Sequence, residues 1–328
     1  MFVGILKIAE WHTIESLLSS GASFLEPVVG IPNCAIAFDM NYDRFSVEIP
    51  VDSEELPKPL PKALNFKIYE NNGSLRLIVS CSSVELFRSF YDFIREVLEL
   101  VHAGSHSPKN AVDEAWSKWG QLIERESSLS REKQIGLIGE LWLLERLAIL
   151  HGWDFALDSW HKVSVSEHDF CLRSSDIEVK TTTNEIRSHM IGSLTQLQPS
   201  HGRELFLLSI QITTASMMAR ESFSLASKVR LIEELLKNSL ENRNKFRYRL
   251  EQVGWQESHM NFYDATYLIR SKSRFIKVDE NCPRIIEISL GGMSDEMRAR
   301  IRAVSYRIDV TGLGTEDDEP AFKKVLQT

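Results

Sequence analysis

The chain has few cysteines: four in 328 residues, at Cys34, Cys81, Cys171 and Cys282. They lie far apart and form no CxxC pair, which argues against a structural zinc site and against a dense disulfide framework. No apolar run approaches the length of a membrane-spanning helix, and the first residues lack the basic start and cleavage site of a signal peptide. These absences predict a cytoplasmic protein in a reducing compartment, without a membrane partner.

Positive charge is also in the minority, with 38 Lys and Arg residues against 46 Asp and Glu residues. The formal net charge is -8 and the sequence pI is about 5.7, which argues against a protein that coats nucleic acid by bulk charge but permits a local basic groove. The sequence contains no helix-turn-helix, zinc-finger or GxxxxGK[ST] motif. Sequence recognition or energy coupling would therefore have to come from a partner or from a domain of unassigned role.

A polar linker is expected at residues 102–111, "HAGSHSPKNA", which contain glycine, serine and proline. We place a domain boundary there, between residues 1–105 and 106–328. The first part reads as a smaller α+β accessory domain, because alternating strands at 64–80 flank an "NNG" turn and a helical apolar pattern follows.

The larger part alternates helices and strands, which predicts an α/β fold. Ser130 is a good N-cap for a long helix that Gly152 ends. Strands are expected in "HDFCL", "DIEVKT", "ELFLLSIQIT", "ATYLIR", "RFIKV" and "YRIDVTGL", and two further helices between residues 223 and 254.

The stretch "EHDFCLRSSDIEVKTTT", residues 167–183, carries the most informative pattern. A hairpin with Ser174 and Ser175 as its loop would set Asp169 opposite Lys180. Alternation then sends the apolar side chains of both strands to the core and places Asp169, Glu178 and Lys180 together on the other face. An ordinary charged hairpin is the simpler alternative.

Two carboxylates that converge on one point form a hard oxygen site of the kind Mg²⁺ prefers. A bound Mg²⁺ lowers the pKa of a coordinated water and stabilises charge on a phosphoryl oxygen. A lysine beside it can orient the attacking water or neutralise developing charge. The pattern therefore indicates phosphodiester hydrolysis.

These residues resemble the signature of the PD-(D/E)XK nuclease superfamily, with "DF" at 169–170 and "EVK" at 178–180, although His168 stands where proline is usual. The "GLIGELWLLERL" helix with Glu140, and "SLTQLQ" with Gln196 in an expected helix, follow the order of an uncharacterised, restriction-associated branch. The resemblance implies a restriction-endonuclease-like core, a mixed sheet flanked by helices. It also implies Mg²⁺-dependent DNA cleavage (Mn²⁺ as possible substitute) beside methyltransferases or ATPases of restriction and phage defence.

By this resemblance Asp169 and Glu178 hold the metal, Glu140 adds to the acidic cluster, Lys180 activates or positions the water, and Gln196 orients nearby groups or DNA. Each has a simpler interpretation. Glu140 could bond a neighbouring backbone group or Arg146, and Gln196 could lie on a helix surface. Asp176 could be a further ligand but suits a turn. His168, His189 and His201 could form a histidine metal site or supply a general base, and His189 and His201 could touch a phosphate, but a solvated surface is the simpler interpretation for each.

Nucleic-acid contacts are expected from Thr182 and from a basic cluster with interleaved aromatics: Lys237, Arg243, Lys245, Arg247 and Arg249. A solvated helix face is the alternative for that cluster. The preferred function is a Mg²⁺-dependent DNA endonuclease, and a homodimer would suit double-strand cutting. A catalytically silent DNA-binding or assembly subunit, and a nuclease for RNA or damaged DNA, are the alternatives.

Overall fold

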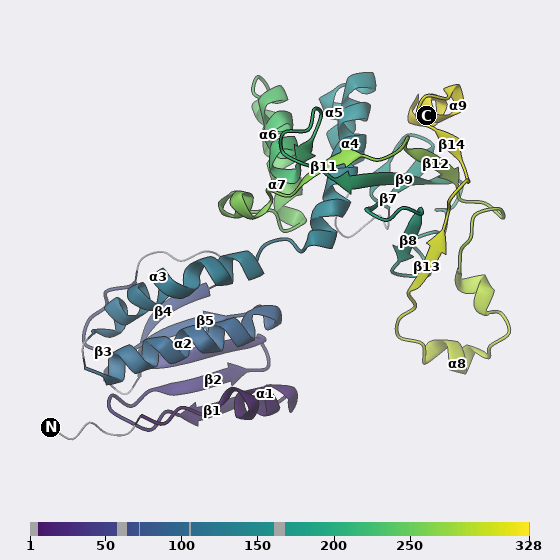
Figure 1. Ribbon diagram of the computed structural model, residues 1–328. Coiled ribbons are helices and arrows are strands. Elements are labelled where there is room, and N and C mark those ends of the chain that lie inside the picture. The colour runs from purple at the N-terminus through teal and green to yellow at the C-terminus, as the bar shows by residue number, and fades with distance from the viewer. Residues whose placement is uncertain (1–5, 58–63, 72, 105, 161–167, 328) are drawn as a thin grey trace. The chain divides into compact units, whose positions relative to one another are not determined.

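The structure is a computed structural model that describes residues 6–57, 64–71, 73–104, 106–160 and 168–327 (Figure 1). The chain forms two compact units, Met1–Ser128 and Leu129–Thr328. None of the helices in the described ranges is both long and apolar enough to cross a membrane.

The N-terminal unit is built on an antiparallel five-stranded sheet. Its strands, in spatial order, are β1 (Phe24–Pro27), β2 (Ala35–Asp39), β3 (Arg44–Val51), β5 (Ser74–Cys81) and β4 (Leu64–Asn71). The expected β4–β5 hairpin is present, with Asn71 opposite Ser74. Alternation along these strands sends one set of apolar side chains into a common core.

Three helices complete this unit: α1 (Trp11–Ser19), α2 (Phe87–His102), which follows a 3₁₀ turn, and α3 (Pro108–Glu126). Helix α3 begins with Pro108 after the N-cap Ser107, and it packs along α2. Ala111, Val112 and Ile123 of α3 are buried in the core of the N-terminal unit. The division therefore falls after Ser128, later than the predicted boundary at residue 105, because apolar burial ties α3 to the first unit.

The C-terminal unit has a mixed seven-stranded sheet around β9 (Glu204–Thr214). Strand β7 (Ser175–Thr182) pairs with β9 in parallel, and β6 (Phe170–Cys171) pairs with β7 antiparallel. The other side of β9 meets antiparallel partners, and the sheet continues with β10 (Phe223–Ser224), β11 (Thr266–Ile269), β12 (Arg274–Lys277) and β14 (Thr315–Glu316).

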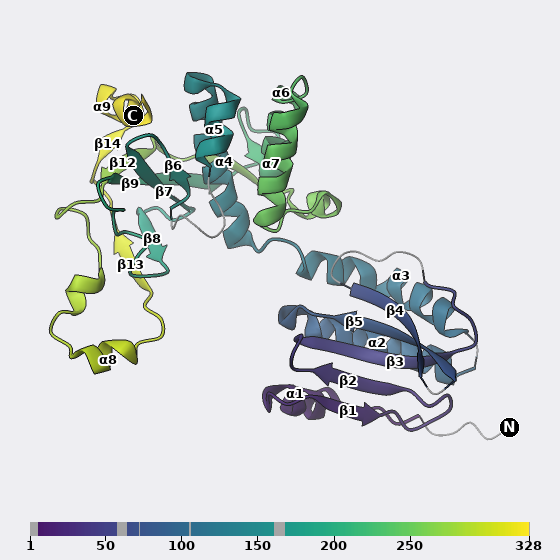
Figure 2. The same ribbon diagram turned by 180° about the vertical axis from the view of Figure 1, so that it is seen from behind.

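Helices cover one face of this sheet (Figures 1 and 2). They are α4 (Arg131–His151), α5 (Trp153–Ser159), α6 (Leu225–Leu235) and α7 (Leu240–Gln252). As predicted, Ser130 caps α4 by accepting a hydrogen bond from the Lys133 amide, and Gly152 ends it at a positive φ of 86°. Leu208 and Ile210 of β9 face this helical layer and share its core.

A two-stranded ribbon covers the opposite face. It pairs β8 (Ser188–Ile191) with β13 (Tyr306–Asp309), and its apolar side chains pack on Leu205 and Leu207 of β9. The chain reaches β13 through a long excursion that carries α8 (Asp295–Ala299) (Figure 1). The C-terminal helix α9 (Pro320–Gln327) contributes Phe322 and Leu326 to the helical-layer core. The unit is thus a mixed sheet with helices on one face and the two-stranded ribbon on the other.

Helix α4 lies directly against β7 at Gly139. A Cβ atom built at Gly139 would come within 1.9 Å of the Thr181 Oγ1 atom and 3.2 Å of a Val179 methyl group, whereas one at Gly136 would meet nothing within 4 Å. Glycine at position 139 therefore permits the close approach of this helix to β7. The contact matters because Glu140 is the next residue.

We predict that Gly139→Ala lowers the free energy of unfolding by about 1–3 kcal/mol, because the added methyl group overpacks the contact with Thr181. Gly136→Ala is the matched control and should be neutral or stabilising by up to ~1 kcal/mol, since alanine favours helix. Urea unfolding of the full chain measures both. Adding Thr181→Ala to Gly139→Ala should recover part of the loss, and equal stability of the two glycine variants would contradict the prediction.

Candidate active site

The hairpin at 168–183 forms with the predicted faces but a different register. Phe170 lies opposite Ile177 and Cys171 opposite Asp176, and the Leu172 amide bonds the Ser175 carbonyl at 2.8 Å. The loop is thus Arg173–Ser174, one residue earlier than expected. Because this changes each pairing by two residues, the alternation of faces is preserved.

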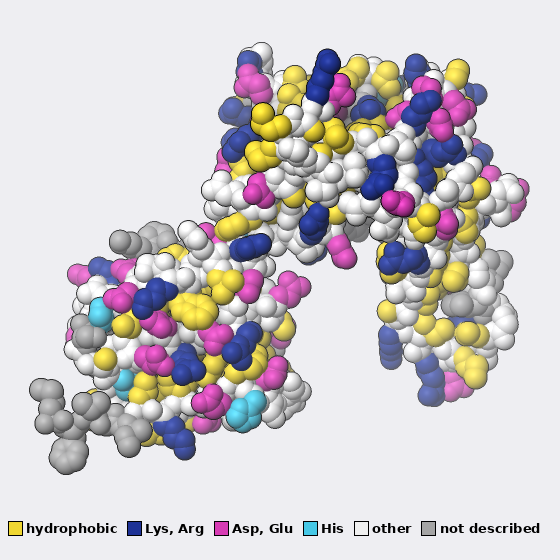
Figure 3. Space-filling model, viewed as in Figure 1, with side chains coloured by type: hydrophobic (Ala, Val, Ile, Leu, Met, Phe, Trp, Pro, Cys, Tyr) yellow, Lys and Arg dark blue, Asp and Glu magenta, His cyan; other side chains and the backbone are white. Residues whose placement is uncertain are grey.

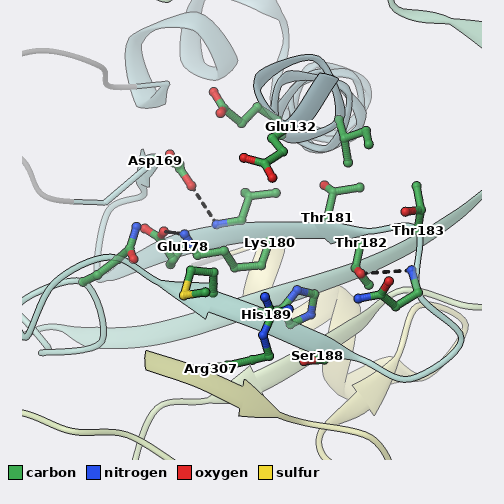
Figure 4. A pocket seen from close by; sticks show the side chains of 17 residues that line it. Glu132, Asp169, Glu178, Lys180, Thr181, Thr182, Thr183, Ser188, His189 and Arg307 are labelled. Carbon is green, nitrogen blue, oxygen red and sulfur yellow. Dashed lines mark hydrogen bonds and ion pairs between the residues drawn. The ribbon is translucent and has the colours of Figure 1, made fainter. Parts of the chain in front are cut away.

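The β6–β7 pairing ends early, and no other strand of the described residues pairs with that edge of β7 beyond Ile177. Beyond Ile177, β7 has β9 on one side and no β6 residue on the other. Asp169 lies at this position, and its Oδ2 accepts a hydrogen bond from the Val179 amide at 2.8 Å (Figure 4). A carboxylate thus replaces the missing ladder partner, which fixes Asp169 beside the strand that carries Glu178 and Lys180.

A cavity of about 680 Å³ opens at this edge. All five residues predicted to serve the reaction line it: Glu140, Asp169, Glu178, Lys180 and Gln196. In Figure 4 the acids Glu132 and Asp169 lie on the α4 side of β7, and His189 and Arg307 lie on the side of the β8–β13 ribbon. Residues from four separate elements therefore converge on one solvent-connected space.

Glu178 and Lys180 form the ionic centre of the cavity. The Lys180 Nζ atom lies 2.9 Å from Glu178 Oε1, and the Glu178 side chain is 2% exposed. Burial, together with the negative charge of Asp169, raises the pKa of Glu178 to about 8, although the charge and hydrogen bond of Lys180 oppose the shift. Glu178 therefore lies where its negative charge is poorly stabilised by the protein alone.

Glu140 points from α4 toward the same cavity and is buried at 4% exposure. Its Oε2 atom accepts a hydrogen bond from the Trp160 indole N–H at 2.9 Å. Arg146, the partner in the simpler interpretation, stacks on Trp142 and donates to the Trp142 carbonyl. The charge of Glu140 also contributes to the raised pKa of Glu178, so the two acids belong to one electrostatic cluster.

Gln196 lines the cavity from a turn, and the helix predicted at "SLTQLQ" is wrong. The Gln196 Oε1 atom accepts from the Gly192 amide at 2.8 Å, and the Ser193 hydroxyl accepts from the Gln196 amide. Side-chain oxygens thus accept hydrogen bonds from backbone amides that a helix would use for its own hydrogen bonds. Pro199 limits the length of the segment. Thr182 is buried, and its hydroxyl accepts from the Asn184 amide.

The donor set suits a divalent cation. Within the described residues, no three His, Cys, Asp or Glu side chains already stand in a metal-binding group. The carboxylates are instead held by Lys180, Trp160 and the Val179 amide. Oxygen donors whose mutual repulsion raises a pKa are the groups that a hard cation such as Mg²⁺ would stabilise, so Asp169 and Glu178 fit the metal in their chemistry.

Asp176 has a structural role on the hairpin. Its Oδ1 atom bonds the Arg203 guanidinium at 2.9 Å, and Arg203 also donates to the carbonyls of Leu172, Arg173 and Ser175. The interpretation as a turn-stabilising acid therefore holds.

The predicted basic cluster lies on or next to α6 and α7, and none of its five side chains lines the cavity. Three of them form ion pairs in the helical layer: Lys237–Glu234, Lys245–Asp158 and Arg247–Glu233. Figure 3 shows Lys and Arg interspersed with Asp and Glu over this part of the C-terminal unit. A role in DNA contact stays a prediction for this cluster.

Three ionisable residues that line the cavity were not part of the predicted site: Glu132, His189 and Arg307. Glu132 and Arg307 carried no motif, and His189 read as a solvated histidine but is 3% exposed. Arg307 reaches the site only because β13 pairs with β8, a contact between distant parts of the chain. Nothing local in the sequence could have indicated it.

A mixed sheet flanked by helices, with an Asp and an ExK sequence at a strand edge, defines a restriction-endonuclease-like core. Residues 36–311 match the sequence model of the family described as "Putative PD-(D/E)XK family member, (DUF4420)", and the chain belongs to that family. The match extends through most of the N-terminal unit as well as the site. Comparison with curated proteins and with solved structures gave no match.

Because the pKa of Glu178 is raised from 4.5 to about 8, the folded chain holds a proton that the unfolded chain releases between these values. Stability should therefore fall as pH rises through this window. We predict that the free energy of unfolding of Glu178→Gln rises relative to that of the wild type over the same window. The difference should reach about a few kcal/mol at the upper end of the window.

Urea unfolding with EDTA between pH 5 and pH 9 measures this difference. Glu251→Gln, at an exposed position of α7, is the control and should follow the wild type at every pH. A constant difference between Glu178→Gln and wild type across the range would contradict the prediction.

Proposed function

We propose that this protein is a Mg²⁺-dependent endonuclease that hydrolyses phosphodiester bonds of DNA, with Mn²⁺ as a possible substitute. The observation that carries the proposal is the meeting of Asp169, Glu178 and Lys180 in one cavity with Glu140 and Gln196. The same residues carry the resemblance to the PD-(D/E)XK nucleases, and the chain belongs to a family described in those terms.

Asp169 and Glu178 would hold the metal, with Glu140 adding negative charge from α4. A bound Mg²⁺ supplies Lewis-acid stabilisation of a phosphoryl oxygen and lowers the pKa of water. The pairing of Asp169 with the Val179 amide keeps its carboxylate beside Glu178 without a side-chain rearrangement. The protein therefore supplies a preoriented oxygen pair at the base of an open cavity.

Lys180 would orient the attacking water and neutralise charge that develops on the phosphate. Its side chain is one-fifth exposed and its ammonium group is held by Glu178, so Lys180 lies between the buried acids and the solvent of the cavity. Gln196 has its carbonyl oxygen engaged by Gly192, which leaves its amide N–H groups as the donors that could orient DNA or water.

A role in a restriction or phage-defence system is the context that the resemblance supports, with a methyltransferase or an ATPase as partner. The sequence carries no nucleotide-binding loop of the GxxxxGK[ST] type, so energy coupling would come from such a partner. Cutting both strands of DNA would require two active sites, which a homodimer supplies.

We predict that the purified protein nicks supercoiled plasmid with Mg²⁺ or Mn²⁺. Asp169→Asn and Lys180→Ala should each lower the rate at least about 100-fold, the scale of losing one electrostatic group in an active site. Lys324→Ala removes an exposed lysine on α9 and is the matched control, which should cut like the wild type.

Equal cutting by all variants would place the activity elsewhere and overturn the assignment. If neither metal supports cutting while DNA binding persists, the protein acts as a DNA-binding or assembly subunit. Cleavage of RNA in preference to DNA would keep the site and change the substrate.

A further inference from the structure

His189 is a buried histidine whose ring lines the cavity. It lies on β8, is 3% exposed, and its Nε2 atom is 2.8 Å from the Ser209 hydroxyl oxygen on β9. Among the described residues, no other group hydrogen-bonds this ring, and Nδ1 is not one of the side-chain atoms that are sealed from solvent without a partner. Nδ1 therefore faces the cavity.

The proton positions on His189 follow from its neighbours. The Arg187 Nη1 group donates to the Ser209 hydroxyl oxygen at 3.0 Å and to the Ser209 carbonyl at 2.8 Å. Arg187 can only donate hydrogen bonds, so the buried Ser209 hydroxyl must donate its own proton to another atom. His189 Nε2 is the acceptor that the described residues supply. Nε2 is then unprotonated, and the neutral ring carries its proton on Nδ1.

Arg187 is itself fixed in place. Its Nη2 group donates to the Ser271 hydroxyl at 2.9 Å and to the Lys272 carbonyl, and its amide donates to Thr311. The guanidinium is buried with polar but uncharged hydrogen-bond partners. A rigid donor of this kind holds the Ser209 hydroxyl in one orientation.

The surroundings also keep the imidazole neutral. Burial lowers the pKa of His189 to about 3, with the positive charges of Lys180 and Arg187 acting in the same direction and Asp309 opposing them. The ring is thus a donor without charge across the physiological pH range.

The simplest ligand for the N–H donor of His189 is an anion. Arg307, on the neighbouring strand β13, also lines the cavity, is exposed, and forms no ion pair with any described residue. An unneutralised guanidinium at the mouth of a cavity attracts negative charge. A fixed N–H group in the same cavity adds a directional contact to an anionic oxygen.

We propose that His189 binds a non-bridging phosphodiester oxygen of the nucleic acid through its Nδ1–H group, in a tautomer fixed by Ser209 and Arg187. The assignment rests on the proposed function, because it takes the cavity as the place where nucleic acid enters. It adds a phosphate contact on the ribbon side of β7, where Glu178 and Lys180 also lie, and opposite Glu140 on α4. Ser209 and Arg187 are positioning residues in this scheme.

Nuclear magnetic resonance of the full chain with ¹⁵N-labelled histidine tests the tautomer independently of any activity. We expect His189, assigned from the spectrum of His189→Asn, to show a protonated Nδ1 and an unprotonated Nε2 without titration between pH 5.5 and 8.5. Ser209→Ala should release the ring into a mixture of tautomers. A protonated Nε2 in the wild type, or a midpoint near 6.5, would overturn the proposal.

Binding of a fluorescent DNA duplex in EDTA, measured by anisotropy, tests the contact. His189→Phe keeps a ring of similar size without a donor and should weaken binding about tenfold, the value of one hydrogen bond to a charged group. His189→Asn keeps an N–H group near the position of Nδ1 and should bind within about threefold of wild type. Circular dichroism checks that both variants fold.

The two proposals fail differently. Wild-type protein that binds DNA but never cuts it removes the nuclease assignment and leaves the His189 contact testable by the same binding series. Equal binding by His189→Phe and wild type, or no DNA binding by the wild type, overturns the phosphate contact even if plasmid is nicked.

Discussion

The site depends on an electrostatic constraint: several carboxylates are gathered at the edge of a sheet where little water reaches them. Each is tolerated because a donor lies beside it. Glu178 has Lys180, Glu140 has the Trp160 indole, and Asp169 has the backbone of β7. These contacts restrain the acids but do not offset the cost of their burial and of their mutual repulsion, which together raise the pKa of Glu178. The fold thereby creates a site that favours the binding of a positive charge.

The sequence predicted the composition of the site better than its geometry. Alternation in a strand is a strict two-residue period, so the shared face of Glu178 and Lys180 survived a loop that starts one residue earlier. Loop position depends on which residues close the turn, and Arg203, which bonds three carbonyls of this turn, lies well along the chain. Gln196 was placed in the cavity by order along the chain, but its turn depends on local side-chain bonds that helical periodicity does not detect.

Long-range pairing accounts for most of what the sequence did not show. The domain boundary lies later in the chain than predicted because α3, although it follows a linker-like segment, buries its apolar face on α2. The basic cluster of α7 is conspicuous in sequence, yet it lies next to acids of neighbouring elements. His189 carried no distinguishing local pattern, since its burial comes from β9 beneath it and β13 beside it. A charge pattern in the sequence shows which charged residues are present. Whether those residues are neutralised or buried depends on their partners in the tertiary structure.

The β8–β13 ribbon has a consequence for how the protein matures. Strand β8 follows closely after β7 in the chain, but its partner β13 is synthesised about 115 residues after β8. Because chains are made at roughly 5–20 residues per second, the carboxylates can be in place for several seconds before the wall opposite them exists. Pairing of such distant strands is also slow to nucleate. A nascent chain would thus hold the acids and Lys180 but an incomplete cavity, so that the order of synthesis delays completion of the site until the C-terminal strands arrive.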